Sequence, residues 1–89
     1  RNVDLRVVGS RRTYLIELKV PTHLRENCAA IGQLLDYGRS CAKQRPVLVL
    51  VTTRFDLNTA KTIVYYRLPI RYVFFSKAKS LEFKSVMAF

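Results

Sequence analysis

The segment VLVLVTT, Val47–Thr53, is an unbroken run of aliphatic and β-branched residues. Such a run is typical of a central, parallel strand that is covered on both faces. Before it, Arg25–Ala42 carries apolar side chains at steps of three and four, which predicts an amphipathic helix. Earlier still, Thr13–Val20 alternates from residue to residue as a strand does. The order strand, helix, strand predicts a right-handed crossover between two parallel strands.

The flanking residues extend this unit on both sides. Val3–Val8 alternates like a strand, and the turn at Gly9-Ser10-Arg11 predicts an antiparallel hairpin with Thr13–Val20. Asn58–Arg67 favours a second helix, although Ile63–Tyr66 also fits a strand. Further expectations are a loop or cap at Phe55–Asn58 and a strand at Ile70–Ser76, with Lys77–Phe89 left unassigned.

We therefore expect one small α/β domain over residues 1–89, because 89 residues are too few for two. Its mixed sheet should hold an antiparallel hairpin, then a parallel crossover, flanked by helices and with the strands in sequential order. The chain starts with Arg1 rather than Met, so we expect it to be a piece of a longer chain.

The charge balance is strongly basic, with 16 Lys and Arg against 6 Asp and Glu, a net charge of +10. Such an excess favours a polyanionic partner, above all nucleic acid, because neutralised phosphates release counterions. No apolar run approaches the roughly 20 residues of a membrane helix, and the first residues lack a signal-peptide pattern. We expect an intracellular protein without a membrane partner.

The cysteines and the one histidine do not suggest a site of their own. Cys28 and Cys41 are thirteen residues apart, near the two ends of the expected helix, and should be unpaired, buried residues in a reducing compartment. His23 is expected in the loop before that helix. A zinc site would need more Cys and His residues at short spacing.

The alternation in Thr13–Val20 separates two faces. One face should carry Tyr14, Ile16, Leu18 and Val20, and we expect it to face the core. The other should carry Thr13, Leu15, Glu17 and Lys19.

The hairpin brings a second acid to the face of Glu17 and Lys19. A turn at Ser10-Arg11 sets Asp4 opposite Glu17, whereas a turn at Gly9-Ser10 sets it opposite Leu15, on the same face. Two close carboxylates repel unless a cation lies between them, and Mg²⁺ suits such an oxygen-rich pair. The Lys19 ammonium would then orient the attacking water of a phosphodiester hydrolysis or take its proton.

A structural interpretation of the same residues is also open. Glu-x-Lys is common on strands, and Asp4 could form an ion pair with Arg6 or Arg12 instead.

Asp4, the strand Ile16–Val20 (IELKV) and the helical segment Ala30–Tyr37 (AIGQLLDY) resemble the PD-(D/E)xK nuclease superfamily. Within it, they are most similar to the RecB-like nucleases, which carry Q-x-x-x-Y on the helix after the E-x-K strand. A similar Gly-Gln-Leu-Leu segment occurs in archaeal-type mismatch and flap endonucleases. The motifs cover about Val3 to Tyr37, and the order of strands extends the likeness to Thr53.

The resemblance implies a restriction-endonuclease-like fold and a role for each matching residue. Asp4 and Glu17 would bind Mg²⁺ or Mn²⁺ together with the Leu18 carbonyl, and Lys19 would be the catalytic lysine. Gln33 and Tyr37 would border the active site, contacting the nucleic-acid backbone or supporting the lysine. The implied activity is hydrolysis of DNA, by an endonuclease rather than an exonuclease, that leaves a 5′-phosphate, with DNA repair as the setting.

Two further expectations follow. Arg11 and Arg12, on the hairpin turn, would contribute to a phosphate-binding rim. The family core usually has a helix and a strand before its Asp strand, and only Arg1-Asn2-Val3 precede Asp4, with Val3 in place of the family's Pro. The exposed edge would then be covered by a missing N-terminal segment, another domain or a homodimer partner. The alternative function is a non-catalytic nucleic-acid-binding or assembly module on the same fold.

Overall fold

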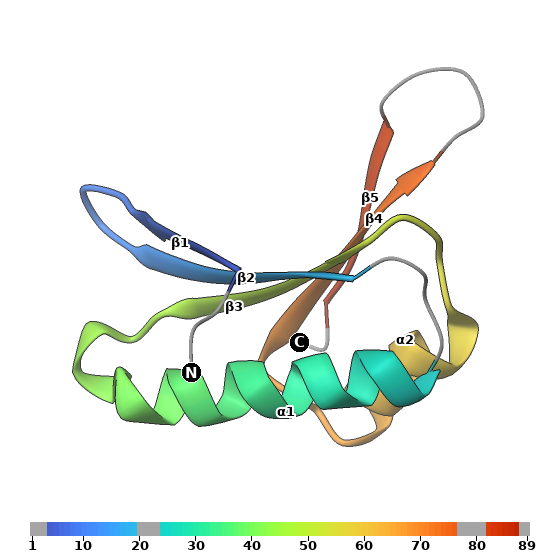
Figure 1. Cartoon of the computed structure of the whole chain (residues 1–89), viewed down its shortest axis with the longest axis horizontal. Coiled ribbons are helices and arrows are strands. Elements are labelled where there is room, and N and C mark those ends of the chain that lie inside the picture. Colours follow the sequence, from blue (N-terminus) through green and yellow to red (C-terminus); the bar gives the residue numbers. More distant parts are fainter. Residues whose placement is uncertain (1–3, 20–23, 77–81, 88–89) are drawn as a thin grey trace.

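A computed structural model describes residues 4–19, 24–76 and 82–87 of the chain. Five strands form one sheet in the order of the sequence, and two helices lie against it (Figure 1). In chain order the elements are β1 (Leu5–Val8), β2 (Thr13–Lys19), α1 (Leu24–Ser40), the 3₁₀ turn η1 (Ala42–Gln44), β3 (Val47–Thr52), α2 (Leu57–Tyr65), β4 (Ile70–Ser76) and β5 (Glu82–Met87). The α/β class, the mixed sheet and the sequential strand order are as predicted.

The sheet is antiparallel at its two edges and parallel in its middle. β1 pairs antiparallel with β2, β2 with β3 and β3 with β4 pair parallel, and β4 pairs antiparallel with β5. The strand β5 lies in the tail that the sequence left unassigned. The chain thus contains two strand–helix–strand units in succession, and the ambiguous segment before β4 forms the helix α2.

Both helices cover the same face of the sheet (Figure 1). One apolar cluster joins them to the three inner strands, with Leu15, Leu50 and Tyr72 from the sheet, Leu34 from α1 and Ile63 from α2 all buried. Two parallel crossovers in sequential strand order place their helices on one side when they have the same hand. The helix-covered face is therefore the core of the domain.

The predicted orientation of β2 is wrong. Leu15 and Glu17 point under the helices, at 1% and 4% exposure, whereas Leu18 is 51% exposed on the opposite face. Both faces of β2 carry apolar side chains, so alternation alone did not reveal which face the helices cover. The expectation that β3 is covered on both faces is also not met in the described part of the chain. Helices cover only one face of β3, and Val49 and Val51 are half-buried on the other.

The helix α1 also differs in detail from the expectation. It ends at Ser40 rather than Ala42, and η1 follows it. Cys28 is exposed and Cys41 half-buried, which corrects the prediction that both are buried; the two thiols are free. Asn27 and Ala30 complete the buried stripe in their place. Val3, Val20 and His23 lie outside the described residues. Neither described helix is long and apolar enough to cross a membrane.

Candidate functional site

The hairpin register sets Asp4 across from Glu17. Leu5 pairs with Ile16, and the amide of Gly9 donates to the Arg12 carbonyl at 2.7 Å, which closes the turn at Ser10-Arg11. The next pair beyond Leu5 and Ile16 is therefore Asp4 and Glu17. This is the first of the two registers that the sequence allowed.

Two hydrogen bonds connect the acidic residues across the hairpin. The Asp4 amide donates to Oε1 of Glu17 at 3.4 Å, and the Leu18 amide donates to Oδ2 of Asp4 at 2.8 Å. Each carboxylate thus accepts a backbone N–H from the neighbouring strand, which fixes both at the end of the hairpin. The Arg6 guanidinium donates to Oε1 of Gln44 at 3.0 Å, and no ion pair joins Arg6 to Asp4, both of which the structure describes.

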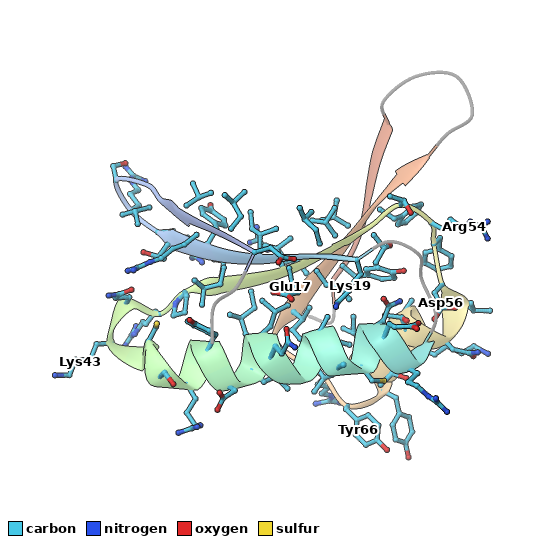
Figure 2. All side chains as sticks on the ribbon, viewed as in Figure 1. Glu17, Lys19, Lys43, Arg54, Asp56 and Tyr66 are labelled. Atoms are coloured by element: carbon cyan, nitrogen blue, oxygen red, sulfur yellow. The ribbon has the colours of Figure 1, made fainter. Side chains whose placement is uncertain are left out.

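The three candidate residues form a gradient from the surface to the interior. Asp4 is exposed, Lys19 is half-buried and Glu17 is 4% exposed. Glu17 and Lys19 are two residues apart on β2 and project from the side of the strand that faces α1 (Figure 2). The structure therefore brings an acid pair and an amine together under the N-terminal half of a helix.

The backbone of Leu18 faces the same place. In an extended strand the N–H and C=O of one residue point toward the same neighbouring strand. Because the Leu18 amide donates to Asp4, its carbonyl is directed to the same edge of β2. The Leu18 carbonyl can thus supply a third oxygen beside the two carboxylates, while the Leu18 side chain is on the open face.

The helix α1 places Gln33 and Tyr37 on the same side of the molecule. They are four residues apart, so they lie one above the other on the helix, and both are half-buried. Tyr37 packs against the core cluster. Long side chains on a helix lean toward its N-terminus, so both residues lean toward the end of α1 that adjoins the carboxyl end of β2.

Arg11 and Arg12 are not part of this group. They are exposed on the hairpin turn, at the start of β2, whereas Lys19 ends that strand. Six residue steps separate Thr13 from Lys19, about 20 Å of extended chain. A role of these two arginines in holding phosphate would therefore be at a distance from the acids.

The donor set fits a hard divalent cation. Two carboxylates and one carbonyl are oxygen ligands, and Mg²⁺ or Mn²⁺ prefers such ligands and keeps several waters. Over residues 4–19, 24–76 and 82–87, no group of three or more His, Cys, Asp and Glu side chains gathers.

Comparison of the chain with protein-family models, with curated proteins and with solved structures found no match.

Sequence reasoning missed a buried polar junction beside the site. The side-chain amide of Asn27, at 0% exposure, donates to Oγ1 of Thr59 at 2.9 Å, and Thr59 donates to Oδ2 of Asp56 at 2.5 Å. Asp56 also caps α2 by accepting the Thr59 amide at 2.8 Å. The spacing of Asp56 and Thr59 before an apolar run is a cap signal, but no pattern predicts that Asn27 reaches them from another helix.

Tyr72 holds the connection between β3 and α2 that ends at this junction. Its hydroxyl accepts the Asp56 amide at 2.9 Å and lies 3.3 Å from the Arg54 carbonyl, which also accepts the Thr52 hydroxyl at 2.6 Å. Thr52 is the register partner of Lys19. The carboxyl end of β3, which pairs with the Lys19 end of β2, is therefore fixed by side-chain hydrogen bonds as well as by packing.

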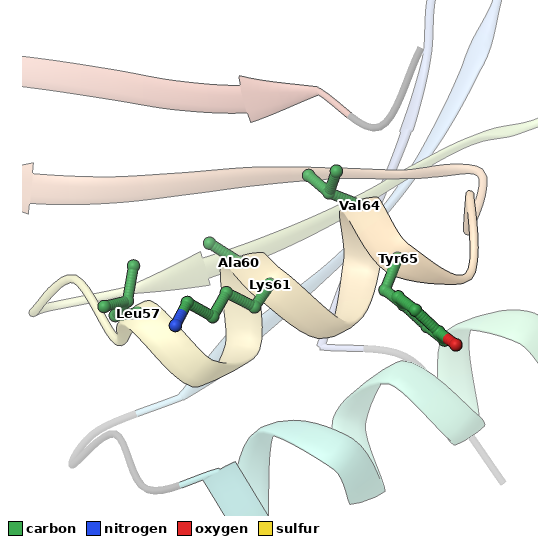
Figure 3. A pocket seen from close by; sticks show the side chains of 5 residues that line it. All are labelled: Leu57, Ala60, Lys61, Val64 and Tyr65. Carbon is green, nitrogen blue, oxygen red and sulfur yellow. The ribbon is translucent and has the colours of Figure 1, made fainter.

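The molecule also has an apolar hollow of about 450 Å³ on the outer side of α2 (Figure 3). Its lining residues are Leu57, Ala60, Lys61, Val64 and Tyr65. It contains one charged side chain and no acid, so it lacks the groups that the acid–amine site offers.

Proposed function

We propose that this chain is a metal-dependent nuclease domain of the RecB-like PD-(D/E)xK kind, with a restriction-endonuclease-like fold, that hydrolyses phosphodiester bonds of DNA. The observation that carries the proposal is the hairpin register, which sets Asp4 opposite Glu17 with Lys19 on the Glu17 face. The net charge of +10 supports a polyanionic substrate.

The residues divide the work as follows. Asp4, Glu17 and the Leu18 carbonyl hold the cation, and the hydrogen bonds from the Asp4 and Leu18 amides keep the carboxylates in place. A bound Mg²⁺ would neutralise charge on the scissile phosphate and favour deprotonation of the attacking water. Lys19 orients that water or accepts its proton. The water oxygen bonds to phosphorus and the bond to the 3′-oxygen breaks. The 3′-oxygen takes up a proton from solvent to become a hydroxyl, and the phosphate remains on the 5′ side.

Gln33 and Tyr37 act from α1. Both are half-buried, and they can contact the carboxylate side of the site or the nucleic-acid backbone. Replacing either should reduce the rate by less than loss of Lys19, because neither belongs to the group that binds the cation or prepares the water.

The test is Lys19→Ala. We expect it to lower the cleavage rate of labelled DNA in Mg²⁺ or Mn²⁺ on the order of a hundredfold or more, because it removes the group that prepares the water. Folding and DNA affinity should change little, since Lys19 is one of 16 cationic side chains. EDTA should stop cleavage by the parent protein.

Lys43→Ala is the matched control. It removes an equal charge from η1, at the far end of the molecule from Lys19 (Figure 2), and should keep the chemistry. If both variants lose activity in proportion to weakened binding, Lys19 is only a phosphate anchor. If the folded parent binds DNA but never cleaves it with either metal, the domain is a non-catalytic binding module.

A further inference from the structure

Two arginines adopt a backbone conformation that normally favours glycine. Among the described residues, the non-glycine residues with positive φ are Arg45, at 47°, and Arg67, at 52°. Each ends a helical segment: the Arg45 amide donates to the Ala42 carbonyl at 3.0 Å, and the Arg67 amide to the Val64 carbonyl at 3.2 Å. Glycine is the usual residue at such an end because it lacks Cβ. Arginine at both positions suggests that its side chain is used.

The two arginines occupy corresponding places in the two crossovers. Leu48 of β3 pairs with Ile70 of β4. Arg45 lies three residues before Leu48, and Arg67 lies three residues before Ile70. Both connections therefore enter the sheet at the amino-terminal edge of the parallel strands, the one after η1 and the other after α2. A hollow of about 250 Å³ at this edge is lined in part by Arg45, Pro46 and Pro69.

The surroundings of this pair are basic. The described residues 57–76 contain no Asp or Glu, and Lys61 and Arg67 add two exposed cations on or directly after α2. Asp36, in the second half of α1, is occupied by Arg39 at 2.6 Å. Arg45 and Arg67 are both exposed, so their guanidinium groups are available to an anion from solution.

An exposed aromatic pair adjoins Arg67. Tyr65 and Tyr66 are 79% and 67% exposed, and their ring centroids lie 4.9 Å apart with an interplanar angle of 85°. Tyr66 lies directly before Arg67 in the chain and projects away from the helix layer (Figure 2). Exposed aromatic rings beside cations form a surface on which unpaired bases stack.

We propose that the amino edge of the parallel strands binds single-stranded nucleic acid. Arg45 and Arg67 hold backbone phosphates, and a base stacks on the Tyr65–Tyr66 pair. The Leu48–Ile70 pair at this edge is four residue steps, about 13 Å of strand, from the row of Lys19, Thr52 and Phe74, so the surface is separate from the acid–amine site. The inference deepens the proposed function and rests on it only for the choice of DNA as the ligand.

The experiment measures binding of a fluorescein-labelled oligothymidine of about 20 nucleotides and of a duplex of equal length, in EDTA, across a salt series. Arg45→Gly/Arg67→Gly removes both charges at positions where glycine fits the backbone, so its melting temperature should be unchanged or higher. We expect the double variant to bind the single strand at least tenfold more weakly. Its log–log salt slope should fall by about 1.4, or about 0.7 for each lost phosphate contact.

Arg71→Thr is the control, because it removes one charge from the exposed side of β4 and should leave affinity and slope unchanged. Tyr66→Ala should weaken single-strand binding several-fold and leave duplex binding unchanged.

Two results would overturn the inference. One is a double variant that binds the single strand as the parent does, or that weakens no more than Arg71→Thr. The other is a Tyr66→Ala variant whose affinity for the single strand and for the duplex falls equally, since stacking then plays no part. An acidic protein partner would in that case be the occupant to consider. Because EDTA prevents metal-dependent cleavage, the binding measurement tests this inference independently of the nuclease proposal. Loss of cleavage in Lys19→Ala, with intact single-strand binding, would separate the two sites directly.

Discussion

At the scale of single residues, Glu17 is the buried acid of the proposed cation site. It is 4% exposed under α1, and its Oε1 accepts the Asp4 amide. Water and salt screen a charge pair less in a buried position than at the surface, so a cation bound beside Glu17 should affect stability. Glu17→Gln keeps the shape and an acceptor for the Asp4 amide but removes the charge.

We therefore expect Mg²⁺ to raise the melting temperature of the parent protein but not of Glu17→Gln. At a concentration ten times its Kd, the ion stabilises the folded state by about 1.4 kcal/mol. For a domain of this size that corresponds to roughly 5–10 °C. A thermal melt with Mg²⁺ and with EDTA measures the effect, and an equal shift in both proteins would contradict a role for Glu17 in binding the ion.

The sequence determined much of the site because strand geometry is periodic. Glu17 and Lys19 share a face whatever the rest of the fold does, and the turn at Ser10-Arg11 then sets Asp4 opposite Glu17. The left-handed backbone of Arg45 and Arg67 had no sequence signal, because the residue that usually marks it is glycine. Nor did Asn27, whose partner Thr59 is 32 residues away.

At the scale of elements, the cap of α2 is a point where one side chain supports a whole helix. Asp56 accepts the amide and the hydroxyl of Thr59. We expect Asp56→Ala to cost about 1–2 kcal/mol of unfolding free energy, because the cap is lost and the Thr59 hydroxyl loses its acceptor. Asp36→Ala, which breaks the exposed Asp36–Arg39 pair, should cost no more than about 0.5 kcal/mol. Urea unfolding of both variants checks the contrast, which equal losses would refute.

The two glycines of α1 differ in the space that an added Cβ would have, because only Gly38 lies close to the sheet. A Cβ at Gly32 would meet nothing within 4 Å, whereas one at Gly38 would lie 3.1 Å from both methyl carbons of Leu48. Gly32→Ala should stabilise the protein by about 0.5–1 kcal/mol, since alanine favours a helix interior. Gly38→Ala should be less stable than Gly32→Ala by about 1–3 kcal/mol, because Leu48 must move. Two variants with the same melting temperature would mean that α1 can shift without cost.

The helices also show where sequence reasoning stops. The spacing of apolar residues predicted both helices, yet it included Cys28, which the structure exposes, and omitted Asn27, which it buries. Neighbouring positions such as these are 100° apart on a helix, so the rotation of the helix about its axis decides which of the two is buried. Packing against α2, where Thr59 accepts the Asn27 amide, determines the rotation.

At the scale of the whole molecule, the sheet has one face under helices and one face open in the described part. Leu5, Val7 and Leu18 are 47%, 41% and 51% exposed on the open face. A chain of 89 residues is stable by roughly 4–13 kcal/mol. Among the described residues, the buried apolar cluster lies on the helix side of the sheet. Stability should therefore depend strongly on the face of the sheet that is altered.

Leu15 and Leu18 provide a matched pair for this expectation. They are the same residue type on the same strand, three residues apart, but Leu15 is 1% exposed under the helices and Leu18 is 51% exposed opposite them. Leu15→Ala should cost about 2–5 kcal/mol, because it removes buried surface and leaves a cavity in the cluster that joins both helices to the sheet. Leu18→Ala should cost less than about 1 kcal/mol, because water already reaches half of the side chain. Denaturant unfolding measures both, and a larger loss for Leu18→Ala would mean that the open face is covered in solution, by a second copy or another part of the protein.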